Sequence, residues 1–127
     1  MEKIIKSGKF TMSTSIKPAK VFIIAISTSL NKEKRLIDLE PLKDAIISIT
    51  KVLRDNNLAI VESTFTPRTT LNLVKSIFDK TEKNYYLLYC PDCVLFGNLI
   101  HELIHNDRII DGINKKSVKR AATMYNA

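Results

Sequence analysis

The feature that most constrains this chain is an alternation between three short apolar runs and longer amphipathic segments. The runs span Val21–Ile26, Leu58–Val61 and Tyr85–Tyr89. The first run is continuously apolar, which is typical of a strand buried on both faces, so we expect it to be the central strand. Strands that alternate with helices form mainly parallel sheets with right-handed crossovers. The sequence therefore predicts a three-layer α/β fold, with a mainly parallel sheet and flanking helices.

Two amphipathic helices are expected between these strands. Asp38 is expected to cap the first, in which apolar residues recur at spacings of three and four as far as Leu53. The second is expected to start at Thr69 or Thr70, where a hydroxyl can serve as the cap, and to end at Lys80. Each of these helices would connect two parallel strands and cover one face of the sheet.

A third helix is expected after Pro91, which ends the third strand. The apolar spacing predicts that it runs from about Val94 to Ile110 and buries one stripe of its surface. The residues expected in that stripe are Phe96, Leu99, Ile100, Leu103 and Ile110.

Size and charge indicate one domain with basic ends. A chain of 127 residues, 45% of them apolar, can bury one core, so we expect a flexible basic arm at 1–19 and a single domain at 20–127. Lys and Arg outnumber Asp and Glu by 20 to 13, which gives a net charge of +7 and favours an anionic partner or simple solubility. In the C-terminal tail, the residues expected to contact DNA phosphates are Lys115, Lys116, Lys119 and Arg120.

The sequence also suggests a compartment. Its longest apolar run, Val21–Ile26, is much shorter than the roughly 18 residues of a membrane span, and no signal-peptide pattern follows the first residues. The two cysteines, Cys90 and Cys93, lie in one Cys-Pro-Asp-Cys segment, a spacing that suits a metal or a redox pair better than a structural disulfide. We therefore expect a cytoplasmic protein that does not associate with membranes.

Residues 20–110 carry strings that resemble the catalytic domain of serine recombinases, the resolvase and invertase family. Ile23-Ile-Ala-Ile-Ser-Thr28 is similar to the end of that family's first strand, and Ser27 takes the place of its nucleophile. The resemblance implies a resolvase-like fold, close to a flavodoxin-like one, with DNA as the partner. The other strings that resemble the family are Leu39-Glu-Pro-Leu-Lys43, Leu58-Ala-Ile-Val-Glu62, Thr66-Pro-Arg-Thr-Thr70 and Asp92-Cys-Val-Leu-Phe-Gly-Asn98.

The same resemblance predicts that strand cleavage has been lost. Cleavage of a phosphodiester needs cations around the phosphoryl oxygens, but Ala25, Cys93 and Gly97 or a neighbour stand where the family has arginines. A serine hydroxyl without a base or a cation is a poor nucleophile, so the simpler interpretation of Ser27 is a capping or loop hydroxyl after a buried strand. We therefore expect a domain that acts without catalysis.

A second motif, His101-Glu-Leu-Ile-His105, matches the HExxH pattern of zinc metallopeptidases. Spacing of four places both imidazoles on one side of a helix, with Glu102 as the general base. Together with Cys90 and Cys93, the two histidines also have the ligand types of a structural zinc site. The simpler alternative is two solvent-facing histidines and two half-buried cysteines that bind no metal.

The leading hypothesis from the sequence is a serine-recombinase-like domain that needs no cofactor and acts through DNA or protein association. One alternative is a small zinc metallopeptidase that uses His101, Glu102 and His105. The other is an interaction domain that associates with itself, and under either non-catalytic hypothesis we expect a protein partner or a homo-oligomer.

Overall fold

The computed structural model describes residues 6–31, 36–91 and 97–126. Its central element is a sheet in the order β1-β4-β5-β6, in which β1, β4 and β5 are parallel and β6 is antiparallel to β5. A separate antiparallel pair, β2–β3, follows β1 along the chain. The strands are β1 (Val21–Ile24), β2 (Leu30–Asn31), β3 (Leu36–Ile37), β4 (Asn57–Val61), β5 (Tyr85–Tyr89) and β6 (Asp111–Gly112).

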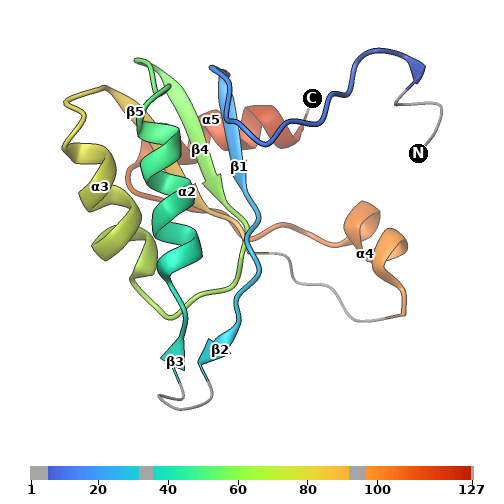
Figure 1. Cartoon of the computed structure of the whole chain (residues 1–127). Helices are drawn as coiled ribbons and strands as arrows, with labels where there is room; N and C mark the ends of the chain where they lie inside the picture. Colours follow the sequence, from blue (N-terminus) through green and yellow to red (C-terminus); the bar gives the residue numbers. More distant parts are fainter. Residues whose placement is uncertain (1–5, 32–35, 92–96, 127) are drawn as a thin grey trace.

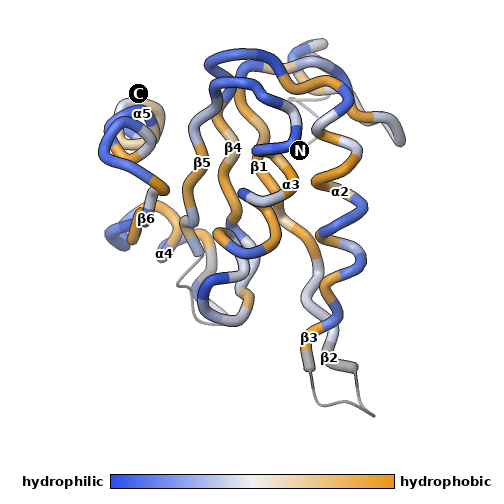
Figure 2. The backbone as a smooth tube through the Cα atoms, turned by 90° about the vertical axis from the view of Figure 1, so that its left-hand side faces the viewer, coloured by the Kyte–Doolittle hydropathy of each residue, from blue (hydrophilic) through white to orange (hydrophobic). Residues whose placement is uncertain are grey.

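Helices lie on both faces of this sheet. Figures 1 and 2 show α2 and α3 on one face and α5 on the other. This arrangement confirms the predicted fold class, a three-layer α/β fold with a mainly parallel sheet. The helices are α2 (Glu40–Thr50), the π-helical turn η1 (Thr70–Lys75) that continues into α3 (Ser76–Asp79), α4 (Leu99–His105) and α5 (Lys115–Tyr125).

Two apolar clusters hold the layers together. The larger one packs α2 and α3 on the sheet and includes Leu42, Ile46 and Phe78, all fully buried. The smaller one packs Ala121 of α5 on β4 and β5. Since every side chain of β4 is buried, this strand is the true centre of the sheet.

The prediction that the first strand is central was wrong. β1 is an edge strand, because only β4 pairs with it in the described part of the chain. Phe22 and Ile24 are buried under α2, but Val21 is 37% exposed and Ile23 is 55% exposed. An apolar run indicates that a strand is suited to burial, but the order of strands in the sheet decides whether neighbouring elements bury it.

The predicted third helix was too long. α4 ends at His105, because Asn106 adopts extended backbone angles of φ −80° and ψ 141°, and the chain then enters β6. Ile100 is 74% exposed and Leu103 is 40% exposed, which contradicts their predicted burial, whereas Ile110 is half-buried against the α5-side cluster. The predicted start at Val94 and the burial of Phe96 and Leu99 lie outside what the structure describes.

Of the predicted helix caps, Thr69 is at the N-cap of η1, whereas Asp38 lies one residue before Leu39, the N-cap of α2, and neither side chain caps its helix. Asp38 Oδ1 accepts a hydrogen bond from the Glu40 amide at 3.0 Å, just before α2. Thr69 precedes η1, but its hydroxyl donates to the Thr66 carbonyl at 2.8 Å and does not cap the helix. In the tight turn before η1 this hydroxyl forms a hydrogen bond with the backbone of the turn itself, which is common for Thr in turns.

Residues 6–20 precede β1 and are exposed along their length. The division into a basic arm and a single domain remains a prediction. In the described part of the chain, no helix is both long and apolar enough to cross a membrane. The cytoplasmic location likewise remains a prediction.

Candidate ligand pocket at the carboxyl edge of the sheet

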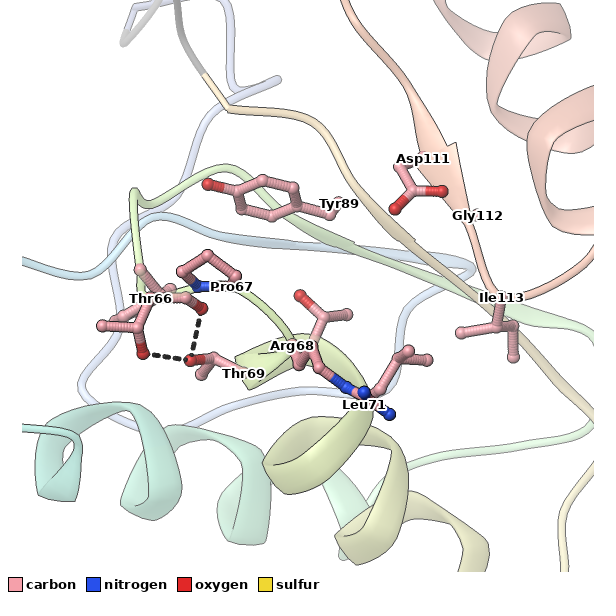
Figure 3. A pocket seen from close by; sticks show the side chains of 11 residues that line it. Thr66, Pro67, Arg68, Thr69, Leu71, Tyr89, Asp111, Gly112 and Ile113 are labelled. Carbon is pink, nitrogen blue, oxygen red and sulfur yellow. Dashed lines mark hydrogen bonds between the residues drawn. The ribbon is translucent and has the colours of Figure 1, made fainter.

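A pocket of about 510 Å³ lies where β4 and β5 end. The turn that follows β4, residues 65–71, forms one wall, as Figure 3 shows. Tyr89 at the end of β5 and residues 111–113, which include β6, form the other. Parallel α/β sheets bind their ligands at the carboxyl ends of their strands, so this is the expected place for a ligand.

The wall after β4 is a tight hydrogen-bonded turn. The hydroxyls of Thr66 and Thr69 lie 3.0 Å apart, and the Thr69 amide donates to the Thr66 carbonyl at 3.2 Å. Arg68 has φ 69°, in the left-handed region that a side chain with a Cβ rarely adopts. This strain at Arg68 lies beside the pocket, as strained backbone often does at ligand sites.

The polar groups of the pocket favour an anionic or hydroxyl-bearing ligand. The helix that starts at Thr70 directs its first amides toward this end of the sheet, and its first turn contains no acidic residue. Arg68 adds a cation, and Asp111 on the opposite wall adds an acceptor for hydroxyl groups. The pocket can therefore hold a phosphate or a sugar ring by hydrogen bonds.

A second cluster lies beside the end of β4, on the α5 side. Glu62 Oε1 accepts a hydrogen bond from the Tyr125 hydroxyl at 2.9 Å and lies 3.7 Å from Arg108 Nη1. Burial raises the pKa of Tyr125 well above its usual value, and hydrogen bonds with Cys90 and Glu62 raise it further. These contacts fasten the end of α5 to β4, and they place the buried Cys90 thiol beside a phenol.

Ser27 is exposed beyond the end of β1 and is not among the described residues that line the pocket. The carboxyl ends of β1 and β5 share one edge of the sheet, as expected for parallel strands. The main chain just before Ser27 is held by Ser63, whose hydroxyl donates to the Ile26 carbonyl at 2.7 Å.

The structure gives the metal hypothesis no site. His101 and His105 are exposed and stacked with ring centroids 4.1 Å apart, and His105 Nδ1 is 2.8 Å from the His101 carbonyl. Cys90 is buried, and Cys93 lies outside the described residues. Within 6–31, 36–91 and 97–126, no group of three or more His, Cys, Asp or Glu side chains is arranged to hold a metal ion.

The basic C-terminal residues belong to a helix that covers the sheet. α5 buries Ser117 and Ala121, whereas the four cations predicted to contact DNA are exposed on its outer side. Arg120 Cζ lies 5.7 Å from the ring of Tyr86, a cation–π contact. The exposed cations are Lys115, Lys116, Lys119 and Arg120.

Sequence reasoning missed the pocket. The string Thr66-Pro-Arg-Thr-Thr70 was noticed only for its resemblance to a recombinase helix, although Pro and Thr after a buried strand are a turn signal in their own right. Asp111 and Gly112 were assigned to no strand, because a two-residue strand leaves no periodic pattern to detect.

The fold and the pocket together define one half of a doubly wound, Rossmann-like nucleotide-binding domain. The units β1-α2-β4-α3-β5 form a βαβαβ half with a cavity at its carboxyl edge. A family model described as "UDP-glucose/GDP-mannose dehydrogenase family, NAD binding domain" matches residues 1–127. The chain belongs to this family.

Relatives agree with this assignment. The UDP-N-acetyl-D-mannosamine dehydrogenase of Methanococcus aeolicus is 41% identical over 123 residues, which cover 95% of this chain and 28% of that protein. A solved structure of the UDP-N-acetyl-mannosamine dehydrogenase Cap5O from Staphylococcus aureus is 35% identical, with a TM-score of 0.90 over 98% of this chain and 32% of that one. The corresponding enzyme from Pyrococcus horikoshii gives 29% and a TM-score of 0.89. This chain thus spans about 28% of the length of the first of these relatives.

These findings correct the earlier hypotheses. The chain is a member of a dehydrogenase family, so the serine-recombinase assignment and the DNA-binding role were wrong. The metallopeptidase and self-association hypotheses gain no support, and the family's domain is described as NAD-binding, which supports neither zinc nor the expectation that no cofactor is needed. The recombinase resemblance rested on short local strings, such as the Ser27-Thr28 pair after an apolar run, and strings of this length do not identify a family.

The residues present do not fit the whole of NAD. Dinucleotide-binding folds hold the pyrophosphate on a Gly-x-Gly-x-x-Gly turn that leads from a strand into a helix. This sequence has three glycines, Gly8, Gly97 and Gly112, and they do not form that string. After β1 the chain enters the β2–β3 pair before α2 begins. The pyrophosphate cradle is therefore absent from residues 1–127.

Proposed function

We propose that this chain supplies the second βαβαβ half of the nucleotide-binding domain of a UDP-sugar dehydrogenase, with a UDP-N-acetylmannosamine as the substrate class. The observation that carries the proposal is the pocket at the carboxyl edge of β4 and β5, in a chain that belongs throughout its length to this NAD-binding-domain family. The substrate class rests on relatives that are 41% and 39% identical and are named UDP-N-acetyl-D-mannosamine dehydrogenases.

In this proposal the pocket residues bind and orient a nucleotide ligand. Arg68 and the first amides of the helix at Thr70 face an anionic group, which needs cations and N–H donors. Asp111 and the Thr69 hydroxyl suit a ribose or a sugar hydroxyl. The bound NAD would supply hydride acceptance, and the groups described here would hold the ligand at the sheet edge.

The proposal is tested by NMR titration of the ¹⁵N-labelled chain with NAD⁺ and, separately, with UDP-N-acetyl-D-mannosamine. We expect the shifts to concentrate on the amides of Thr69, Leu71, Tyr89 and Gly112, which line the pocket. Replacing Arg68 with Ala should weaken binding by about threefold to tenfold, because one charge-assisted contact is worth roughly 1 kcal/mol at an exposed site.

Arg54→Ala is the matched control for Arg68→Ala. Arg54 is also an exposed arginine, but it precedes β4 and lies at the opposite end of the sheet. It should leave the affinity unchanged. Inorganic pyrophosphate is the second control, because a chain of net charge +7 attracts any polyanion. Identical shifts with pyrophosphate, or equal effects of the two arginine variants, would contradict the proposal.

A further inference from the structure

A second pocket of about 510 Å³ lies at the amino edge of the sheet, where β5 begins. Its walls are the loops that precede β4 and β5, one side of η1 and α3, and the start of α5. Tyr85 lines this pocket and Tyr89 lines the pocket at the carboxyl edge, so roughly 13 Å of β5 separates the two. They can therefore hold two different ligands at the same time. We call the second one the amino-edge pocket, and its charged and amide-bearing lining residues include Lys75, Asp79, Lys83, Asn84, Asn114 and Lys116.

Positive charge exceeds negative charge in the amino-edge pocket. Three of its lining residues are lysines, and Asp79 is the one acidic lining residue in the part of the chain that the structure describes. Both Asp79 oxygens are engaged, because Oδ2 accepts a hydrogen bond from Lys75 Nζ and Oδ1 accepts one from the Tyr85 hydroxyl, at 2.5 Å each. These two hydrogen bonds lower the pKa of Asp79, which therefore stays ionised at neutral pH and offsets only Lys75.

Lys83 and Lys116 are the cations that remain. Both are exposed, and neither ammonium group has an ion pair or a hydrogen bond with another described residue. They reach the pocket from two segments that are distant along the chain, the loop before β5 and the first turn of α5. Two cations that line one cavity without a counter-ion favour an anionic ligand.

The walls of this pocket are held in place and present hydrogen-bond donors. The Asn56 amide donates to the Asn84 carbonyl at 2.6 Å, and the Asn84 amide donates to Asp55 Oδ1 at 2.8 Å, so the loops before β4 and β5 are tied together. Asn114 Oδ1 accepts a hydrogen bond from the Ser117 amide at 2.9 Å, which leaves the Asn114 NH₂ group to donate. The pocket therefore has side-chain amides beside its cations.

Charge and size together indicate the class of ligand. Three ammonium groups and one carboxylate leave a net charge of +2, and a phosphate monoester carries about −1.5 to −2 at neutral pH. Pockets of roughly 300–1,000 Å³ hold whole small molecules, so this volume of about 510 Å³ is larger than a free phosphate ion needs. Side-chain amides suit the hydroxyl groups of such a molecule.

We propose that the amino-edge pocket binds a small phosphate ester of the size of a sugar phosphate, with Lys83 and Lys116 at the phosphate and the Asn84 and Asn114 amides at the hydroxyl groups. The ligand is distinct from the nucleotide at the carboxyl edge and binds together with it. It also joins the start of α5 to the loop before β5, because it contacts a cation from each.

The test is a ¹⁵N NMR titration of the full chain with glucose 1-phosphate, and with inorganic phosphate and glucose in separate arms. We expect a millimolar dissociation constant for the ester, because exposed charge contacts are individually weak. The shifts should concentrate on the amides of Asn84, Tyr86 and Lys116. Inorganic phosphate should bind at least threefold more weakly, and glucose should cause no shift there. Equal affinities of ester and phosphate, or no saturable shift at these amides, would overturn the proposal.

A pair of double variants separates this pocket from general attraction to a basic protein. Lys83→Gln with Lys116→Gln should weaken binding of the ester at least tenfold. The matched control is Lys80→Gln with Lys119→Gln, which removes the same charge from exposed lysines of α5 and the end of α3 that do not line the pocket. It should change the affinity by less than twofold. Equal losses in the two double variants would show nonspecific binding and overturn the proposal. Circular dichroism checks that each variant is folded.

A variant with the opposite sign gives a second check. Asp79→Asn removes the carboxylate and frees Lys75, so binding of the ester should tighten at least threefold, while the new amide oxygen can still accept from Tyr85. Glu82→Gln is its control, since Glu82 is an exposed acid near the pocket that does not line it. An equal gain in the two variants would contradict a defined site.

The amino-edge pocket does not depend on the proposed nucleotide role. Its double variant should leave the NAD⁺-induced shifts at Thr69 and Gly112 unchanged. Ester-induced shifts that survive Arg68→Ala and disappear in the double variant would support the amino-edge pocket even if NAD⁺ caused no shift at all. Ester-induced shifts that Arg68→Ala abolishes would place the ester at the carboxyl edge and overturn the proposal.

Discussion

At the β6 edge of the sheet, Gly112 lies against Ser117 and Val118, and the Asn114 side chain holds the start of α5 at that point. At the β1 edge, Val21 is 37% exposed and Ile23 is 55% exposed. The difference does not come from composition, because β1 is continuously apolar and β6 is Asp-Gly. Both strands are at edges of the sheet, yet α5 packs on the polar strand β6, whereas the apolar strand β1 keeps an exposed face. Apolar composition therefore indicates what a strand is suited to bury, and the tertiary structure decides which part of the strand is covered.

The strongest test of this comparison truncates one isoleucine of the buried strand β4 and one isoleucine of the edge strand β1. Ile60 of β4 is 0% exposed, so Ile60→Ala should lower the free energy of unfolding by about 2–5 kcal/mol. Ile23 is 55% exposed, so Ile23→Ala should cost about 1 kcal/mol or less in the isolated chain. Urea denaturation measures both. Equal costs would mean that β1 is covered in solution by a neighbour that the chain itself supplies.

Adding one methyl group at Gly112 should disturb the packing of α5 on β6. A Cβ at position 112 would lie 2.8 Å from Val118 Cγ2, 3.0 Å from the Val118 amide nitrogen and 3.1 Å from Ser117 Cβ. Gly112→Ala should therefore destabilise the fold by about 1–3 kcal/mol, measured by thermal unfolding. Adding Val118→Ala should recover only part of this loss, since one of the close atoms is main chain. Full stability in Gly112→Ala alone would show that α5 does not press on β6.

The smallest expected effect concerns the start of α5. Asn114 Oδ1 accepts a hydrogen bond from the Ser117 amide at 2.9 Å, which makes it the N-cap of this helix. Asn114→Ala should cost about 1 kcal/mol, whereas Asn114→Asp, which can accept the same bond, should cost little. Chemical denaturation of the two variants measures the difference. If both variants lose the same stability, the contribution of Asn114 is not its cap.

The elements could be predicted because their signals are local. The apolar spacing between Asp38 and Leu53 predicted α2, which ends at Thr50, three residues before the predicted end. β4 and β5 were predicted within one residue of their observed bounds. The long third helix was wrong because its apolar spacing continued past His105, where Asn106 turns the chain into an extended conformation. Periodicity alone does not detect such a stop when no proline or glycine marks it.

The pocket could not be predicted for a different reason. Its residues come from the turn after β4, the end of β5 and the residues at β6, which are far apart along the chain. Only the pairing of β6 with β5 brings Asp111 opposite Arg68. The HExxH-like string illustrates the reverse error, because a strong local match at His101–His105 has no third ligand near it among the described residues.

The sequence by itself determined the alternation of strands and helices and the side of α2 that is buried, because these depend on residue type and local spacing. Only the tertiary structure decided that β4 is central and β1 is at the edge, that Asp111 faces the turn after β4, and that α5 covers β4 and β5 but not β1. These features depend on which strands pair. Pairing is set by burial summed over the whole sheet, which no single segment of the sequence contains.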